Sequence, residues 1–276
     1  FQVSQRGDYS SATASAHNSY TMDRWQTTSV GVNSTVQHNS VTLPNGWETN
    51  SAKITASSSA SSGAYIGLSQ PVEYGKRILR SGGTWTVSAW VKTNRNDVVF
   101  RLGAVKNMGQ PVVGDGEWHY HTATFSYDTA GSDTQGVFLI TYDNAATAIT
   151  TNDYIEIAEF QLELGKVATP FEHRSYGEEL ALCQRYYYKS TGSIYLSGQT
   201  YAANNSVDGM RVPWNFPVVM RANPATSVSG GNDGGSNASL SIIADSPEVA
   251  SLNLISTNSY KDVWWQSGSI TADAEL

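Results

Sequence analysis

The clearest pattern along the chain is a strict alternation of apolar and polar positions over residues 84–93. The positions of one set are Trp85, Val87, Ala89 and Val91, and those of the other are Thr84, Thr86, Ser88, Trp90 and Lys92. Successive side chains of a strand point to opposite faces of its sheet. The segment is therefore predicted to be a strand with one buried face and one solvated face.

Short runs of the same character recur along the chain, separated by Gly, Asn, Asp and Ser. They cover residues 52–57, 64–69, 98–104, 117–127, 136–142 and 153–164, and later 193–201, 209–212, 225–229, 239–244, 248–256 and 260–266. Many short strands with little helix between them are typical of a sandwich or jelly roll. We therefore predict an all-β protein whose first part is a jelly-roll β-sandwich.

One segment, residues 175–190, interrupts the strand pattern. Ser175 and Glu178 form a capping box, which predicts the start of a helix. Residues at helical spacing follow, namely Leu180, Cys183, Gln184 and Tyr187. The predicted domains are a jelly roll at residues 1–172, a connecting helix at 173–192 and a smaller C-terminal β domain at 193–276. An isolated helix of about 15 residues is marginal in water, so its stripe must pack either on its own chain or on symmetry mates.

Composition excludes several classes of partner. The chain has 276 residues, 15% charged residues and a net charge of −7. It has no cluster of Lys and Arg, which argues against nucleic acid and anionic membrane as partners. No apolar run approaches the roughly 20 residues that a membrane span needs. Its single cysteine, Cys183, cannot form an internal disulfide, and the absence of an initial Met suggests a fragment or a processed product.

No familiar catalytic motif is present: there is no nucleophile elbow, phosphate-binding loop, zinc spacing or dinucleotide fingerprint. His119 and His121 stand two apart on a predicted strand, as in some metal sites, but the next acid is Asp128. A metal site lacks its third ligand here. We therefore expect two histidines on a polar sheet face, with no metal and no cofactor.

Four acids lie along one predicted strand: Asp153, Glu156, Glu159 and Glu163. A glycosidase needs two carboxyls at a set separation across a sugar, which a sequence does not show. A calcium ion at the rim of a sandwich is also compatible with such acids, although no residue is assigned to it. We expect most of these acids to be solvated and the protein not to be an enzyme.

Aromatic residues supply the candidate binding positions. Trp90 falls on the polar face of its strand together with Lys92, where a large ring could stack on the apolar face of a sugar. Trp47 lies in a predicted loop, and Tyr260 and Trp264 form a second cluster near the C-terminus. Packing under a loop or a neighbouring subunit remains the alternative for each ring. The candidate glycan-binding residues are Trp90, Lys92, Trp47, Tyr260 and Trp264.

Several segments resemble a domain common in bacteriophage tail-fibre and virion structural proteins, particularly of marine and cyanobacterial phages. They are residues 1–26, residues 116–120 with Phe125, residues 155–188 (IEIAEFQLELGKVATPFEHRSYGEELALCQRYYY), residues 216–224 and residues 271–276. The resemblance touches nearly the whole chain, and the block at 155–188 is its most specific part. It implies a carbohydrate-binding-module-like jelly roll, then a helix and a distal β domain.

The resemblance also implies a function. Such fibres are usually homotrimers on the virion, at the tail or the head, and recognise polysaccharide on the host cell surface. It supplies no catalytic residue. Contacts between subunits would use the helix stripe of Leu180, Cys183 and Tyr187. Two alternatives stay open: a polysaccharide depolymerase carried on a fibre, and a purely structural head or tail decoration protein.

Overall fold

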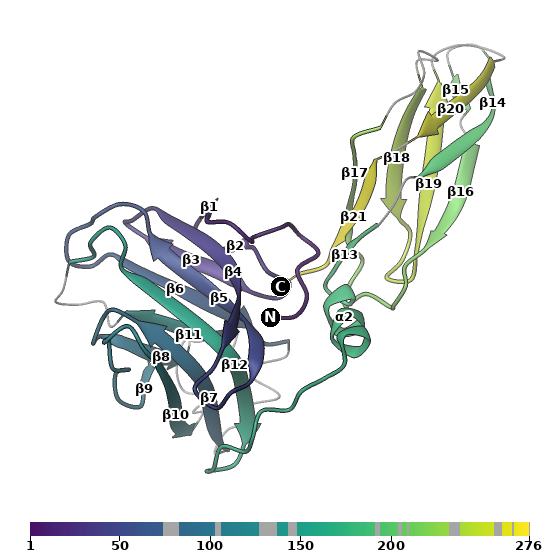
Figure 1. Ribbon diagram of the computed structural model, residues 1–276. Helices are drawn as coiled ribbons and strands as arrows, with labels where there is room; N and C mark the ends of the chain where they lie inside the picture. The colour runs from purple at the N-terminus through teal and green to yellow at the C-terminus, as the bar shows by residue number, and fades with distance from the viewer. Residues whose placement is uncertain are drawn as a thin grey trace. The chain divides into compact units, whose positions relative to one another are not determined.

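The chain forms two compact units, Phe1–Ser175 and Tyr176–Glu275 (Figure 1). The computed structural model describes residues 1–73, 83–102, 106–126, 137–142, 148–190, 194–203, 206–208, 210–231, 238–256, 261–266 and 268–275.

The first unit consists of two antiparallel sheets. One sheet has the strand order β1-β4-β5-β12-β7-β10, and the other has the order β2-β3-β6-β11-β8-β9. The strands are β1 (Thr13–Ser15), β2 (Ser19–Tyr20), β3 (Gln26–Val30), β4 (Ser34–Thr42), β5 (Glu48–Ala56), β6 (Tyr65–Pro71), β7 (Thr84–Thr93), β8 (Val98–Leu102), β9 (Lys106–Met108), β10 (Trp118–Ser126), β11 (Val137–Tyr142) and β12 (Tyr154–Leu164). The two are called here the β7 sheet and the β6 sheet.

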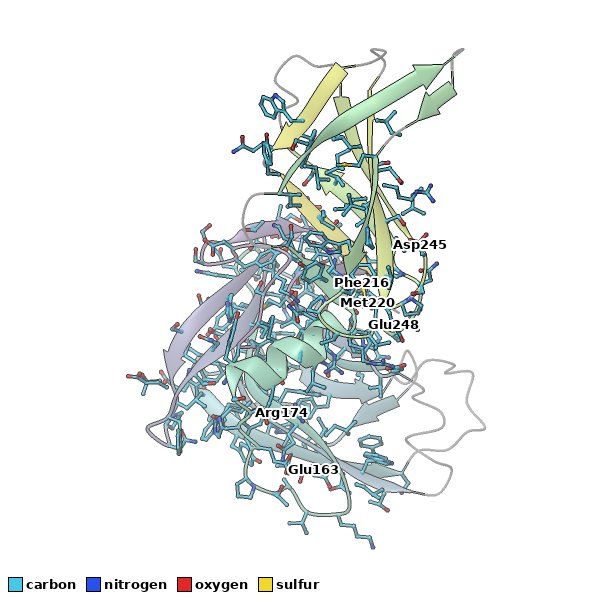
Figure 2. All side chains as sticks on the ribbon, turned by 90° about the vertical axis from the view of Figure 1, so that its right-hand side faces the viewer. Glu163, Arg174, Phe216, Met220, Asp245 and Glu248 are labelled. Carbon is cyan, nitrogen blue, oxygen red and sulfur yellow. The ribbon has the colours of Figure 1, made fainter. Side chains whose placement is uncertain are left out.

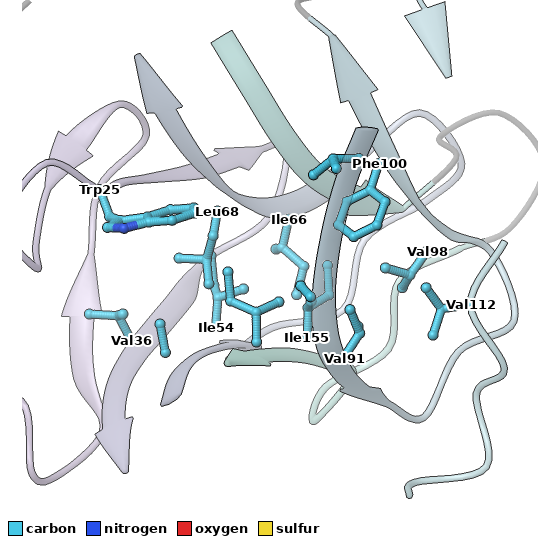
Figure 3. Packing of buried hydrophobic residues seen from close by; sticks show 14 of the residues in the cluster. Trp25, Val36, Ile54, Ile66, Leu68, Val91, Val98, Phe100, Val112 and Ile155 are labelled. Atoms are coloured by element: carbon cyan, nitrogen blue, oxygen red, sulfur yellow. The ribbon is translucent and has the colours of Figure 1, made fainter. Parts of the chain in front are cut away.

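The core of the first unit lies between these sheets (Figure 3). The β7 sheet contributes Val36, Ile54, Val91 and Ile155, and the β6 sheet contributes Ile66, Leu68, Val98 and Phe100. Alternate residues of each strand reach this core, as expected for a sandwich. The prediction of an all-β fold with a β-sandwich is confirmed.

Strand β7 has the predicted bounds, and its four apolar positions are buried. The expectation of a solvated opposite face is wrong for part of the strand, because Thr86 and Ser88 are each only 2% exposed. After β12 the chain turns back, and the Thr86 hydroxyl donates a hydrogen bond to the carbonyl of Gly165 at 2.9 Å. The returning chain therefore covers polar positions that local alternation assigns to solvent.

The second unit is built from one helix and short strands among the residues that the structure describes. The helix is α2 (Tyr176–Gln184), and the strands are β13 (Tyr187–Lys189), β14 (Tyr195–Ala203), β15 (Ser206–Asp208), β16 (Met210–Asn215), β17 (Ala225–Ser229), β18 (Ala238–Ala244), β19 (Val249–Ser256), β20 (Lys261–Gln266) and β21 (Ser269–Asp273). They form three-stranded sheets of order β13-β21-β17, β15-β14-β20 and β16-β19-β18. Buried Phe216 and Met220 lie close together at the end of this core nearest to α2 (Figure 2).

The helix begins where the capping box predicts, directly after Ser175, but the predicted extent of 175–190 is wrong. It ends at Gln184, and Tyr187 belongs to β13, where it pairs with Asp273 of β21. Tyr188 packs against the second core. Tyrosine fits a half-buried strand well, and helix propensity is a weak preference that packing overrides. Within the described residues no helix is long and apolar enough to cross a membrane.

Candidate functional site

A row of aromatic and polar side chains crosses the outer face of the β7 sheet. Trp90 pairs in register with Tyr120 of β10 on one side and with Ala158 of β12 on the other. The rings of Trp90 and Tyr120 lie 5.4 Å apart between centroids, and Tyr120 is 45% exposed. Ala158 is fully buried, so other groups cover that side of the indole. This region therefore presents aromatic surface next to a polar strand.

A β-bulge brings Glu159 to the same face. Between Ala158 and Gln161 strand β12 advances three residues while β7 advances two, so β12 contains one extra residue. Glu159 adopts a left-handed backbone conformation with φ of 49°, which is uncommon for any residue except glycine. Bulges are known for re-aiming side chains near functional sites. Here Phe160 still packs against the core, whereas Glu159 contacts groups outside it.

The Glu159 carboxylate is buried without full hydrogen bonding. The residue is 7% exposed, and its Oε1 atom has no hydrogen-bond partner among the described residues. The indole of Trp90 lies close enough to the carboxylate to lower its pKa, and His173 Nε2 lies 3.8 Å from Oε1. Burial raises the pKa of Glu159, and His173 and Trp90 offset part of that rise. A buried carboxylate oxygen is costly when unpaired, so the burial of this atom is not compensated by a hydrogen bond.

Trp47 and His173 continue the row at the turn between β4 and β5. Their rings stack with centroids 5.2 Å apart at an interplanar angle of 26°, and Phe171 meets His173 edge-on at 5.0 Å. Trp47 is 58% exposed. The turn places it there because Gly46 adopts φ of 85° and Asn45 accepts a hydrogen bond from the Trp47 amide. Glycine adopts such a conformation at no steric cost.

Residues 165–173, called here the return segment, hold His173 over β12. Gln161 accepts a hydrogen bond from the Glu172 amide at 2.8 Å and donates one to Thr169 at 3.3 Å. Glu163 accepts hydrogen bonds from both the amide and the hydroxyl of Thr169. Outward-facing residues of β12 thus fix the segment that carries His173.

Together these groups form what we call the aromatic row, which crosses β10, β7 and β12 and reaches the β4–β5 turn. Its members are Tyr120, Trp90, Glu159, His173 and Trp47, each in contact with the next. Neighbouring strands lie about 4.8 Å apart, so the row extends over more than one ring width. It offers apolar ring faces and a buried acceptor to a ligand.

Lys92 lies on the same face as Trp90, between Trp118 of β10 and Glu156 of β12. Glu156 is 6% exposed and accepts hydrogen bonds from Asn39 at 2.8 Å and Ser51 at 2.6 Å. Its carboxylate is therefore satisfied by the protein itself, in contrast to that of Glu159.

The expectation that most acids of this strand are solvated is wrong. Asp153, Glu156 and Glu159 are each less than 8% exposed. Asp153 forms an ion pair with Arg95 at 2.8 Å, which compensates its burial. The fourth acid, Glu163, bonds the return segment. Each carboxylate thus has a different bonding environment. The alternation of apolar and polar residues along the strand does not reveal the partner of each acid.

His119 and His121 do share a face, but the expectation of a polar face is wrong. They pair with Val91 and Ala89, whose side chains point into the core. His121 lies 5.3 Å from Phe100 between ring centroids, and burial lowers the pKa of His121. His119 bonds Asp115 at 2.9 Å. Because β10 is the last strand of its sheet, these inward positions lie at the margin of the core.

In the second unit, Trp264 stacks on Tyr195 with centroids 6.3 Å apart at 25°. Tyr195 is 59% exposed, whereas neighbouring Trp265 is 6% exposed and belongs to the core. Tyr260 lies outside the described residues. No group of three or more His, Cys, Asp or Glu side chains suited to a metal ion occurs in the part of the chain that the structure describes.

No family model and no curated protein matches this chain in sequence. Distant structural similarity exists to jelly-roll domains of the carbohydrate-binding-module type and to a phage tailspike domain. The family 11 carbohydrate-binding module of a Clostridium thermocellum cellulosomal cellulase has 14% identity and a TM-score of 0.33, covering 56% of this chain and 97% of that one. The enzymatically active domain of bacteriophage CBA120 tailspike protein 4 has 12% identity and a TM-score of 0.36, covering 51% of this chain and 19% of that one.

A Fischerella cyclase in its apo form has 14% identity and a TM-score of 0.36, covering 58% of this chain and 99% of that one. Enzymes and non-catalytic modules therefore both occur among the similar structures. The match spans only about a fifth of the tailspike chain. At these values the similarity concerns the fold alone.

Sequence reasoning placed Trp90, Lys92 and Trp47 on candidate surfaces, and the structure brings Trp90 and Trp47 into one row. It missed Tyr120, Glu159 as a binding group, and His173. A signal for Glu159 does exist: apolar positions are odd-numbered at Ile155 and Ile157 but even-numbered at Phe160, Leu162 and Leu164. A change of parity within one strand predicts a bulge.

Proposed function

We propose that the first unit is a non-catalytic carbohydrate-binding module whose ligand lies on the aromatic row. The observation that carries this proposal is the contact between Trp90 and Glu159. It combines an aromatic platform with a buried carboxylate that has an unpaired oxygen. A sugar ring has an apolar C–H face and a hydroxyl-bearing edge, so it complements both groups.

The energetics favour a flat ligand of this kind. An unpaired buried polar atom costs about 1–3 kcal/mol, and a hydroxyl that donates to Glu159 would recover part of that cost. Exposed Tyr120 and Trp47 at the two ends of the row would lose water-exposed apolar surface when a ring covers them. Binding would thus satisfy the acceptor and bury the rings together.

At a finer level we propose a virion fibre protein that recognises polysaccharide on the host cell surface. The support is the resemblance of residues 155–188 to bacteriophage fibre proteins, together with the exposed rings described above. Partners would then include other virion proteins.

The native protein tests this proposal on an array of purified polysaccharides and on intact host cells. Binding of one glycan class without release of new reducing ends supports a binding module. Release of reducing ends indicates a depolymerase instead. Absence of binding to every glycan and to cells favours a structural decoration protein.

We also propose a homotrimer. Cys183 and Tyr187 are 3% and 8% exposed within a single chain, so they are not available to a symmetry mate. Leu180 is half-buried, and Leu182 on the same helix is 40% exposed. Multi-angle light scattering at micromolar concentration should give three times the monomer mass, and Leu180→Asp should lower it. A monomeric native protein would remove this proposal.

A further inference from the structure

We infer that Glu159 makes the aromatic row selective for sugars that donate hydrogen bonds to its carboxylate, and selective against sugars that carry a carboxylate at that position. This inference rests on the proposed carbohydrate binding and names the class of ligand. The donors would be hydroxyls of a neutral sugar or the ammonium of an amino sugar. Uronic acids and other acidic sugars would be excluded.

The first step is the position of Glu159 within the row. Its carboxylate contacts the indole of Trp90 on one side and lies 3.8 Å from His173 on the other. His173 in turn stacks on Trp47. Although Glu159 is only 7% exposed, a ligand that covers both Trp90 and His173 would lie close to its charge.

The second step is the balance of charge on this face. Two lysines of the sheet, Lys53 and Lys92, lie in register on either side of Glu156, and exposed Lys166 and Arg174 lie within and directly after the return segment. Lys53 also lies over the ring of Tyr154, 4.4 Å from its centroid. Within the described residues, the cation within ion-pair range of Glu159 is His173, which is charged only when protonated. A second carboxylate beside Glu159 would add repulsion in a desolvated place.

The third step is preorganisation. The indole of Trp90 and the carboxylate of Glu159 are neighbours on the same face of the sheet. The bulge and the return segment hold the remaining partners, since Gln161 and Glu163 bond that segment directly. A platform and an acceptor held at a fixed geometry discriminate between ligands more sharply than mobile groups do. The choice of ligand is therefore expected to depend on Glu159 and not on the exposed rings alone.

The test uses the full chain on an array of immobilised oligosaccharides in four matched classes: neutral, N-acetylated, amine-bearing and uronate-bearing. The native protein should bind neutral or amine-bearing members at least about tenfold more tightly than their uronate counterparts, a difference that one charged hydrogen bond can supply. Glu159→Gln keeps the shape and an acceptor for Trp90 but removes the charge. It should weaken binding about tenfold and narrow the discrimination against uronates.

The matched control is Glu248→Gln, which removes the same charge from an exposed residue of the second unit (Figure 2) and should leave every affinity unchanged. A pH series gives a second readout that a purely structural role would not move. Native affinity should fall more steeply with falling pH than the affinity of Glu159→Gln, because only the native protein has the carboxylate that takes up a proton.

The possible outcomes fall into three groups. Tight uronate binding by the native protein, or unchanged affinities in Glu159→Gln, overturns the selectivity while leaving carbohydrate binding intact. No glycan bound by the native protein overturns the proposed function and this inference with it. A neutral-only profile and an amine-only profile both support the inference and identify the donor.

Discussion

The two units each carry an aromatic pair on the outer face of a sheet, yet the pairs differ in their surroundings. Trp90 and Tyr120 in the first unit lie beside the buried carboxylate of Glu159. Trp264 and Tyr195 in the second unit lie in register with exposed Ser197 and Gln266. Burying a carboxylate costs free energy, whereas exposing two rings costs little beyond ordinary surface. The comparison leads to the proposal that the unpaired acceptor, rather than the ring, marks the glycan-binding face.

The largest effect should come from Arg95→Ala. This substitution should destabilise the first unit and leave the stability of the second unit unchanged. Arg95 pairs with Asp97 and Asp153, and Asp153 is buried. Removing one partner of a buried ion pair costs about 3–5 kcal/mol. Differential scanning calorimetry should show an earlier transition for the first unit and an unchanged one for the second, with glycan binding lost when the first unit unfolds. A joint shift of both transitions would show that the units do not unfold independently.

The next effect contrasts the two tryptophans directly. Trp90→Ala should weaken glycan binding by about 2 kcal/mol or more, roughly 30-fold, as expected for a central aromatic anchor. Trp264→Ala should leave the affinity unchanged. Both affinities can be measured by isothermal titration calorimetry after circular dichroism has shown that the variants are folded. Equal losses in the two variants would mean that the buried acceptor does not mark the site.

Glu159→Gln should raise stability while lowering affinity. Burial raises the pKa of Glu159 in the folded protein above its ordinary value of 4.5. Below pH 4.5 the carboxyl is protonated in both states and does not destabilise the fold. As the pH rises through the pKa of the folded protein, the buried carboxylate becomes charged and the free energy of unfolding decreases. At pH 7 the variant should be more stable by about 1 kcal/mol, the lower end of the cost of an unpaired buried polar atom, and the gain should vanish below pH 4.5.

Urea unfolding of the native protein and the variant at both pH values measures this difference. A variant that is less stable at pH 7 would mean that the carboxylate stabilises the fold, and the contrast with the second unit would then lose its physical basis.

The smallest effect should come from Trp47→Ala. Trp47 stacks on His173 at the end of the row and is largely exposed, so its loss should cost about 0.5–1.5 kcal/mol of binding free energy, the usual value for an aromatic pair. The same titration measures it. A loss larger than that of Trp90→Ala would move the centre of the site to the β4–β5 turn.

The sequence predicted those parts of the fold in which local pattern and packing agree. Strand β7 was predicted with its observed bounds because its apolar positions alternate without interruption. Strands β1 to β4 were not predicted, since Ser, Thr and Asn dominate them: β4 buries only Ser34 and Val36 among its nine residues. A strand rich in polar residues is defined by its hydrogen bonds to neighbouring strands. The sequence of the segment alone does not show these partners.

The candidate site was predictable only in part for the same reason. Trp90 stood out because a large ring interrupts a polar face. The contacts of Trp47 with His173 and of Glu159 with Trp90 join segments far apart in the sequence, and no local pattern encodes them. The shift in the parity of apolar residues around Glu159 was readable, and it would have indicated the bulge.

The central claim is that glycan binds at Trp90 and Glu159 of the first unit and not at the exposed pair of the second. The indole N–H signals of the eight tryptophans, assigned with single Trp→Phe variants, report on both faces in one nuclear magnetic resonance titration. With a neutral oligosaccharide that binds on the array, the signal of Trp90 should move with saturating dependence while that of Trp264 stays fixed. Movement of Trp264 with a fixed Trp90 would contradict the account.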